Sequence, residues 1–274
     1  MAGQSLHTVK IEDLADPRVA DYANLKDADL ARRGGLFIAE GPLVVRTLLR
    51  SSYTTRSVLV HDGKLESLRD ALSDLPASIP VYTATQPVLD AITGFHLHRG
   101  VLACGQVPAA RDATDLARSC RVLVVLENLT NHDNVGGLFR VAAALGGDRC
   151  GIILSPACCD PLYRKALRVS IGHALTVPYA RADLDPAFWT GLASLGYTLV
   201  ATDAGRAHVP VHDIAPPDRL ALVLGSEGPG LTPQTTQALL AAGGFNARIP
   251  LAPTVDSLNV VVAAGIILSH LVRP

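Results

Sequence analysis

The sequence predicts an α/β fold with a smaller N-terminal α/β domain and a C-terminal domain built on a parallel sheet. Short apolar runs typical of strands alternate with amphipathic stretches typical of helices along most of the chain. In the C-terminal half the strand-like runs, such as 122–126 and 220–224, are continuously apolar. Continuous apolar strands are typical of a parallel sheet that helices cover on both faces.

The composition favours a folded protein and excludes several classes. Of the 274 residues 49% are hydrophobic and 18% charged, the opposite of a disordered chain. The net charge of −1 does not identify partners, because nucleic-acid-binding domains carry a basic patch rather than a basic total. Aromatic residues, at 4%, are too few for recognition of single-stranded bases mainly by stacking.

The cysteine pattern and the lack of targeting segments predict a cytoplasmic protein without a metal site. The five cysteines show no metal-ligand spacing, which fits reduced thiols. The N-terminus lacks the layout of a signal peptide. The longest apolar run, 260–268, is too short to cross a bilayer, so no membrane contact is expected.

The first domain is predicted to span 1–107. After a polar start with a helix around 20–30, strands are expected at 36–39, 57–60, 80–83 and 100–107, and helices at 41–49, 64–72 and 85–92. Residues 108–118, rich in Pro, Ala and mixed charge, are interpreted as a linker, with an ordinary surface loop within one domain as the alternative.

The second domain is predicted to span 119–274. Its expected strands are 122–126, 151–154, 197–202 and 220–224, and its expected helices include 141–145, 163–171 and 258–271. Three separated segments of this domain carry polar groups where strands or helices begin or end.

The first segment follows the strand at 122–126. A polar loop leads to a helix expected to begin near Val135, with Asn134 as its N-cap and Arg140 off its apolar stripe. The paired glycines at 136–137 reduce helix stability, which predicts a close backbone approach there. The plainer interpretation is that Asn134 is only a cap and Arg140 only a surface charge.

The second segment follows the strand at 220–224. It is a glycine-rich turn with a single carboxylate, Glu227, at the carboxyl end of a predicted parallel strand, where α/β folds bind ligands. It contains neither the Gly-Lys-Ser/Thr of a phosphate loop nor the dinucleotide pattern GxGxxG. Such a turn exposes backbone groups that could bond the edge of a purine. A tight turn with a solvated Glu227 is the alternative.

The third segment, 249–259, leads into the apolar C-terminal helix. Asp256 or Ser257 is expected to cap that helix. Asn259 would lie within its first turn beside an apolar surface, so its amide must find partners. A cap or a brace for a neighbouring loop would also satisfy it.

Together and in this order, the three segments closely resemble the motifs of the SpoU (TrmH-type) branch of the SPOUT RNA methyltransferases. The resemblance covers about 120–272 and includes the helix expected within 160–174. The N-terminal half resembles the ribosomal-protein-L30e-like domain on 33–42 and 98–103. The resemblance implies a deep C-terminal trefoil knot, a homodimer formed through the C-terminal domain, and S-adenosyl-L-methionine (SAM) as methyl donor.

The resemblance implies methylation of a ribose 2′-hydroxyl, and 23S ribosomal RNA is the expected substrate. The reaction is expected to need no metal. The implied catalytic cluster is Asn134, Arg140, Glu227, Ser257 and Asn259. The residues implied for the SAM pocket are Leu224, Gly225, Gly228, Ile249, Leu251 and Leu258. The residues expected to contact RNA are Arg33, Arg164, Lys165 and Arg168, the last three of which would otherwise form a solvated helix face.

The chain departs from the family pattern in two places. His132-Asp133 occupies loop positions where Pro or small residues are common, and residues 251–254 replace the usual Met-x-Gly run after Ile-Pro. These differences concern the loop shape and the methionine side of the pocket.

Other functions remain open. The RNA could be a transfer RNA, or the chain could be an RNA-binding protein of this fold without turnover, which the complete motif set disfavours and a lack of SAM binding would favour. An α/β enzyme with another nucleotide cofactor is disfavoured, because the phosphate-loop lysine and the dinucleotide fingerprint are both missing.

Overall fold

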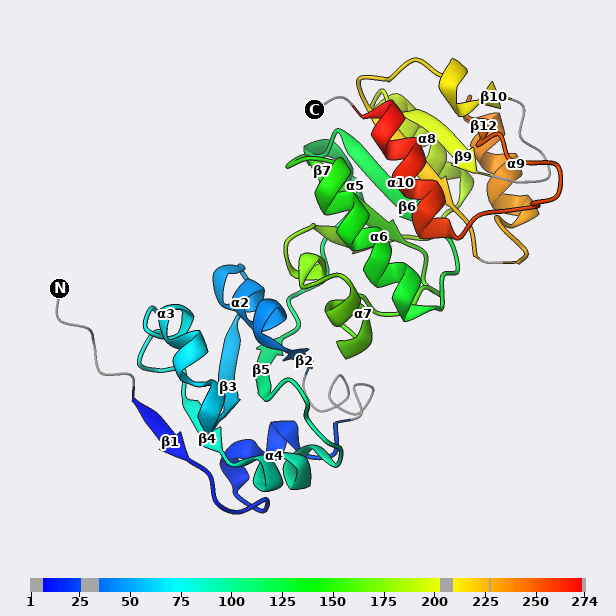
Figure 1. Cartoon of the computed structure of the whole chain (residues 1–274). Helices are drawn as coiled ribbons and strands as arrows, with labels where there is room; N and C mark the ends of the chain where they lie inside the picture. Colours follow the sequence, from blue (N-terminus) through cyan, green and yellow to red (C-terminus); the bar gives the residue numbers. More distant parts are fainter. Residues whose placement is uncertain (1–6, 26–34, 203–208, 227, 273–274) are drawn as a thin grey trace. The chain divides into compact units, whose positions relative to one another are not determined.

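The computed structural model describes residues 7–25, 35–202, 209–226 and 228–272. The chain divides into two compact units (Figure 1). Unit 1 comprises residues up to Ala109 together with Leu162–Thr176, and unit 2 comprises Ala110–Pro161 and the chain from Val177 onward. Helix Arg164–Val169 (α7) therefore packs on the N-terminal sheet, although the sequence predicted it within the C-terminal domain.

Unit 1 is a five-stranded mixed sheet in the order β1-β4-β3-β5-β2. Its strands are β1 Thr8–Lys10, β2 Leu36–Glu40, β3 Thr55–His61, β4 Val81–Ala84 and β5 Val101–Gln106. Strands β1, β4 and β3 are parallel, and β5 is antiparallel to both β3 and β2. Its helices are α2 Pro42–Arg50, α3 Arg69–Leu72, α4 Gln86–Thr93 and α7, with 3-10 turns at Pro17–Tyr22, Asp62–Lys64, Glu66–Leu68 and His173–Leu175.

Two expectations for unit 1 were wrong in detail. The helix predicted at 64–72 is a run of two short 3-10 turns followed by the single turn α3, because few of its side chains are buried. In the predicted helix around 20–30, the described part is a 3-10 turn that ends at Tyr22, and 26–30 lie outside the described residues. Strand β1 was not predicted.

Unit 2 is a seven-stranded parallel sheet in the order β10-β12-β9-β11-β6-β7-β8, as the sequence predicted for its class. Its strands are β6 Val122–Leu126, β7 Cys150–Leu154, β8 Tyr179–Arg181, β9 Thr198–Thr202, β10 Val209–Pro210, β11 Leu220–Leu224 and β12 Phe245–Arg248. Its helices are α5 Ala113–Ser119, α6 His132–Leu145, α8 Pro186–Ser194, α9 Pro233–Ala241 and α10 Val260–Leu271, with a 3-10 turn at Val211–Asp213.

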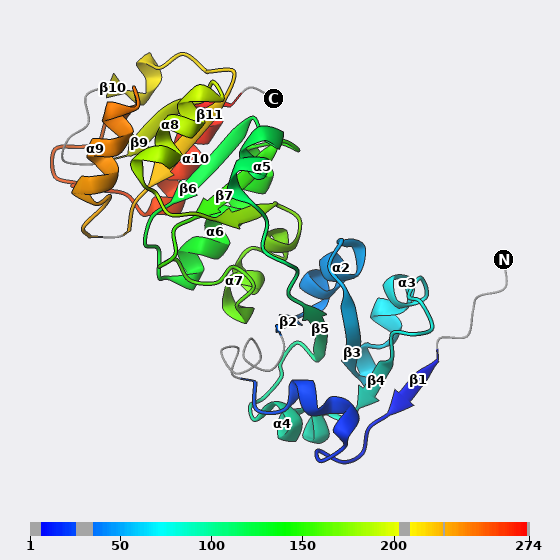
Figure 2. The same ribbon diagram turned by 180° about the vertical axis from the view of Figure 1, so that it is seen from behind.

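Helices cover both faces of this sheet (Figures 1 and 2). Leu116 of α5, Trp189 of α8 and Leu239 of α9 share one core with alternate side chains of the central strands, among them Leu123 and Val125. Helices α6 and α10 pack together on the other face. Because both faces are covered, the strands can be apolar throughout.

The predicted linker 108–118 contains a core helix. Asp112 caps α5 by accepting a hydrogen bond from the Asp115 N–H (2.9 Å), and Leu116 and Ala117 are buried in the core of unit 2. In the described parts of the chain, no helix is long and apolar enough to cross a bilayer.

Helix α6 begins earlier than predicted. Asn131 is its N-cap, accepting a hydrogen bond from the Asp133 N–H (2.8 Å), so the expectation that Asn134 caps this helix was wrong. Both asparagines suit a cap, and the helix begins at the first of them. Asn134 is consequently buried within the first turn.

Candidate active site

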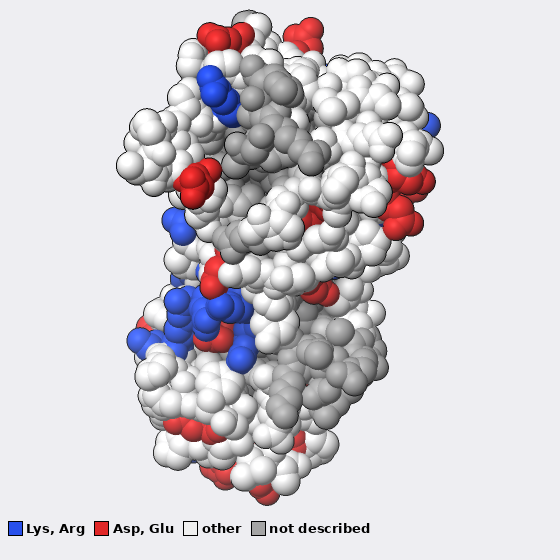
Figure 3. Space-filling model, turned by 90° about the vertical axis from the view of Figure 1, so that its right-hand side faces the viewer, with Lys and Arg blue, Asp and Glu red and all other residues white. Residues whose placement is uncertain are grey.

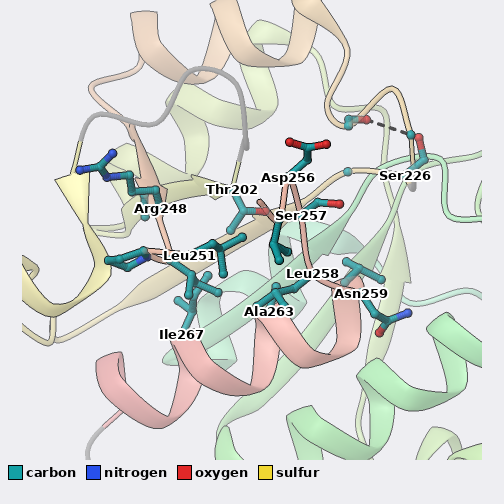
Figure 4. Close-up of a pocket in the computed structure, with 18 residues that line it drawn as sticks. Thr202, Ser226, Arg248, Leu251, Asp256, Ser257, Leu258, Asn259, Ala263 and Ile267 are labelled. Atoms are coloured by element: carbon teal, nitrogen blue, oxygen red, sulfur yellow. Dashed lines mark hydrogen bonds between the residues drawn. The ribbon is translucent and has the colours of Figure 1, made fainter. Parts of the chain in front are cut away.

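Three adjacent parallel strands end at one edge of the unit 2 sheet. Strands β12, β9 and β11 are neighbours, and their carboxyl ends place Arg248, Thr202 and Gly225 around one cavity of about 740 Å³ (Figure 4). Residues 249–259 then run along this cavity into α10, whose Ala263 and Ile267 also line it. The second and third segments of the sequence analysis therefore converge, as expected for the carboxyl ends of parallel strands.

The glycine-rich loop after β11 folds back on itself. Ser226 and Gly230 form an isolated antiparallel bridge, with the Gly230 N–H donating to the Ser226 carbonyl (3.0 Å). A Cβ on Gly225 would lie 2.2 Å from the Gly230 carbonyl carbon, so a side chain cannot be accommodated there without moving backbone. Gly228 has φ +94°, in the region that favours glycine. The turn thus leaves its backbone exposed along the cavity.

Glu127, directly after β6, fixes the exit of this loop. Its carboxylate is buried and accepts hydrogen bonds from the Thr232 N–H (2.8 Å), the Thr232 hydroxyl (2.8 Å) and the Thr235 hydroxyl (2.5 Å). Thr232 is the N-cap of α9, the helix that follows the loop. A carboxylate is favourable at this helix end, where N–H groups and the helix dipole point toward it.

Helices α6 and α10 are joined at the edge of the cavity. The Asn259 side-chain amide donates to the Asn134 side-chain oxygen (3.0 Å), while the Asn259 oxygen caps α10 by accepting from the Val261 N–H (2.9 Å). The expectation that Asp256 or Ser257 caps this helix was therefore wrong, because α10 begins only after Asn259. A Cβ on Gly137 would lie 2.8 Å from a methyl group of Val261. The close approach predicted for the paired glycines is thus found at Gly137.

Most of the residues expected at the SAM site line the cavity. They are Gly225, Gly228, Ile249, Leu251 and Leu258, together with Ser257 and Asn259 of the expected catalytic cluster. Leu224 is fully buried in β11 and is not among the described lining residues. Glu227 lies outside the described residues.

The remaining expected catalytic residues lie on α6. Asn134 is 5% exposed and reaches the cavity edge through Asn259. Arg140 is exposed and is not among the described residues that line the cavity. A hydrogen bond between two asparagines therefore links the cavity to α6.

Sequence reasoning missed several lining residues. Thr202, Arg248 and Ile267 line the cavity but carry no motif of their own. Thr202 was the last residue of a predicted strand, and the rule that ligands bind at carboxyl strand ends would have selected it had the strand order been known. Arg248 ends β12, a strand that was not predicted.

The cations expected to contact RNA belong to unit 1. Arg164 and Arg168 form ion pairs with the buried Glu40, at 3.6 and 3.5 Å, and the Arg164 guanidinium lies 4.6 Å from the ring centre of Phe95. Lys165 is exposed. Arg33 lies outside the described residues.

Comparison with protein families decides what this architecture is. Residues 121–269 match the SpoU rRNA Methylase family. The chain belongs to the SpoU rRNA methylase family. It is therefore an RNA methyltransferase, and its seven-stranded parallel sheet is the family's α/β catalytic fold.

Relatives in the SpoU family match nearly the whole chain. An uncharacterised tRNA/rRNA methyltransferase of Mycobacterium tuberculosis is 41% identical, covering 93% of this chain and 88% of the relative. The 23S rRNA (guanosine(2553)-2′-O)-methyltransferase RlmP of Bacillus subtilis is 27% identical, covering 96% of this chain and 98% of the relative.

Solved SpoU-type structures share the fold. An AdoMet-bound rRNA methyltransferase of Sinorhizobium meliloti matches with a TM-score of 0.77 and 24% identity, over 96% of this chain and 97% of that one. The AdoMet complex of the SpoU methyltransferase AviRb of Streptomyces viridochromogenes matches with a TM-score of 0.76 and 22% identity, over 93% and 96%. The trefoil knot stays a prediction.

Proposed function

We propose that this SpoU-family protein transfers a methyl group from SAM to a ribose 2′-hydroxyl of ribosomal RNA, most specifically of 23S rRNA. The convergence of the glycine-rich loop and residues 249–259 on one cavity at the carboxyl strand ends carries the proposal. The relative RlmP, named for 2′-O-methylation of 23S rRNA and similar along nearly its whole length, supports the choice of RNA.

The cavity suits SAM in size and chemistry. Its volume of about 740 Å³ lies within the range of small-molecule sites, which are mostly apolar with a few polar groups. Backbone groups of Gly225 and Gly228 would bind the purine edge, and Ile249, Leu251 and Leu258 would contact the apolar faces of the ligand. When bound, SAM supplies an electrophilic methyl carbon on its sulfonium.

The protein's main contribution is alignment. Methyl transfer of this kind needs no covalent enzyme intermediate, and correct orientation of two reactants can lower a barrier by several kcal/mol. The hydrogen bond between Asn134 and Asn259 fixes α6 against the cavity, so a ribose held by α6 would keep a constant position relative to the methyl donor. Ser257, on the cavity wall, is a further polar group for the ribose.

Arg140 is assigned to the phosphate beside the target ribose. A guanidinium keeps its proton at neutral pH and makes forked contacts with phosphate, so it is better suited to anchoring than to removing the 2′-hydroxyl proton. A carboxylate such as Glu227, or water, would complete proton removal. If Arg140→Lys retained near-normal turnover, the forked phosphate contact would be refuted.

Unit 1 is assigned to RNA binding. Its sheet and α7 would be an L30e-like substrate-binding domain, made mainly of residues 1–107. The residues that would contact RNA are Arg33, Arg164, Lys165 and Arg168. Phosphate contacts make affinity fall steeply with salt. A salt-insensitive affinity for RNA would exclude this assignment.

A homodimer through unit 2 is part of the proposal. Val262 and Ile266, one helical turn apart on α10, are 51% and 37% exposed, which leaves an apolar strip beside the cavity. A second copy that covers this strip would place the SAM site near the subunit contact. Since the substrate is ribosomal RNA, the protein is placed in the cytoplasm.

A methyl-transfer assay tests the proposed function. Purified protein is incubated with SAM carrying a labelled methyl group and with unmodified 23S rRNA, or with bulk transfer RNA, and the RNA is digested to nucleosides. We expect label in a 2′-O-methylated nucleoside of 23S rRNA only. Label in transfer RNA alone would support the tRNA alternative. If the protein neither binds SAM nor transfers the label, it would be an RNA-binding protein without turnover.

A further inference from the structure

The loop between α4 and β5 presents three polar side chains from a rigid frame. His96, His98 and Arg99 are exposed within residues 94–100, while Leu97 between them is fully buried. Leu97 anchors the loop in the core of unit 1, where it packs in the same cluster as Leu89 and Ile92 of α4. The exposed side chains are therefore attached to a fixed backbone.

Asp90 fixes this backbone further. Its carboxylate accepts hydrogen bonds from the Leu97 N–H (2.9 Å) and the Gln86 amide (2.6 Å), and it lies 2.7 Å from the His96 ring nitrogen Nδ1. The His96 contact, followed by the Leu97 N–H, lowers the pKa of Asp90 to about 2. Asp90 is thus ionised at neutral pH, and the loop is organised before any partner binds.

Arg99 extends from this loop to the start of α2. A Cβ on Gly41 would lie 2.8 Å from the Arg99 Cδ and 3.1 Å from its Nη1, so the side chain passes directly over Gly41. Gly41 follows Glu40, the carboxylate with which Arg164 and Arg168 pair. Arg99 therefore lies beside the residue that follows Glu40, and we call Glu40, Arg99, Arg164 and Arg168 the Glu40 cluster.

The charges of the Glu40 cluster do not cancel. The cluster holds three arginines and one glutamate, and two of the arginines pair with Glu40, which is 7% exposed. Among the described residues, the structure gives Arg99 no ion pair and no side-chain hydrogen bond. Figure 3 shows Lys and Arg side chains gathered into a patch on one face of the molecule. Like charges held together are unfavourable unless an anion faces them, so the cluster fits a polyanionic partner.

The members of the cluster have different roles. Arg164, whose side chain is 22% exposed, lies against the Phe95 ring and pairs with Glu40, so it holds α7, β2 and the loop together in addition to the charge it offers to RNA. Arg99 is exposed, and its backbone is held by the anchored loop through the buried Leu97. A fixed backbone reduces the freedom that is lost on binding, which favours Arg99 as a contact.

We propose that Arg99, assisted by the exposed His98, is a principal RNA-phosphate contact of unit 1, and that Glu40 and Arg164 position the surface around it. The proposal rests on the proposed RNA methylation and adds a contact to it, on the 94–100 loop as well as on α7. The RNA is recognised here by its phosphates, consistent with the scarcity of aromatic side chains.

Steady-state kinetics with unmodified 23S rRNA tests this contact. For Arg99→Ala we expect the KM for RNA to rise about fivefold to tenfold in roughly 0.1 M salt, with the slope of log KM against log salt reduced by about 1. The kcat and the KM for SAM should not change. Arg99→Lys keeps the charge and should recover most of the loss, which separates a contact from a folding defect.

Arg56→Ala is the control, because Arg56 is an exposed arginine at the start of β3, whereas the 94–100 loop contacts the end of β3, where the His61 N–H donates to the Gly100 carbonyl (2.7 Å). Arg56 forms an exposed ion pair with Asp21 at 3.8 Å. Arg56→Ala should leave the KM for RNA unchanged. If wild-type protein methylates RNA but Arg99→Ala keeps its KM and salt slope, the contact is refuted while the methylation stands. If wild-type protein methylates no RNA, the proposed function itself fails.

Discussion

Thr235→Val tests the role of Glu127 as the anchor of the cofactor loop. The substitution preserves the shape of a buried side chain and removes one hydroxyl, the donor of the 2.5 Å hydrogen bond to the Glu127 carboxylate. A hydrogen bond to a charged group contributes about 1.5–3 kcal/mol. Glu127 keeps both hydrogen bonds from Thr232, so we expect a loss of about 2 kcal/mol in the free energy of unfolding.

The measurement can be confined to unit 2. Trp189 is the single tryptophan of the chain, is fully buried, and lies in the core that α8 and α9 share. Its fluorescence during urea unfolding therefore reports on the unit that contains the loop. Thr236→Val is the control, because Thr236 is the buried neighbour on α9 and the structure gives it no hydrogen bond to Glu127. If both substitutions cost the same, the reasoning is refuted.

A double-mutant cycle sharpens the test. Glu127→Gln would place an amide nitrogen opposite the Thr232 N–H if its oxygen keeps the two hydroxyl donors. Two donors would then face each other in a buried site, which costs about 1–3 kcal/mol. Because Glu127 and Thr235 are in direct contact, their combined effect should differ from the sum by at least about 0.5 kcal/mol. Strict additivity would contradict a direct interaction.

Three further predictions concern the cavity, the helix contact and the thiols. Gly225→Ala should weaken SAM binding at least about tenfold by calorimetry, because its methyl group meets backbone at 2.2 Å; unchanged affinity would exclude the observed loop geometry. Gly137→Ala should lower the free energy of unfolding, measured by Trp189 fluorescence, by about 1–3 kcal/mol, because the new methyl group overlaps Val261. An unchanged free energy of unfolding would contradict the close packing of α10 against Gly137. Burial raises the pKa of Cys159 from 9.0 to about 11. Its thiolate fraction at pH 8 should therefore be roughly a hundredfold smaller than in the unfolded chain. Rapid modification of Cys159 in the native protein by a thiol reagent would contradict this.

The strands of unit 2 were the most predictable part of the fold. Strands 122–126 and 220–224 were predicted with the bounds that the structure gives, because their runs are apolar throughout and end at polar or glycine residues. The helix at 64–72 was less predictable, because its apolar spacing does not reveal how few of its side chains find a core. The spacing of apolar residues shows only a helical periodicity, whereas packing against a core decides whether a helix forms.

Contacts between distant segments lay beyond the sequence. The motif at 249–259 predicted a polar site, but that Asn259 donates to Asn134 depends on the packing of α10 on α6. Likewise, α7 pairs with Glu40 of β2 although its neighbours in sequence belong to unit 2. The strand order decides which chain ends meet, and a single sequence does not contain it.

Ribose-methylation mapping tests the central claim most directly. Total RNA from cells with and without the gene is compared at every nucleotide, and the deleted strain is complemented with wild-type protein or with Arg140→Ala. The account predicts that one 2′-O-methyl group of 23S rRNA disappears on deletion, returns with the wild type and does not return with the variant. Identical ribose-methylation maps in all four strains would contradict it.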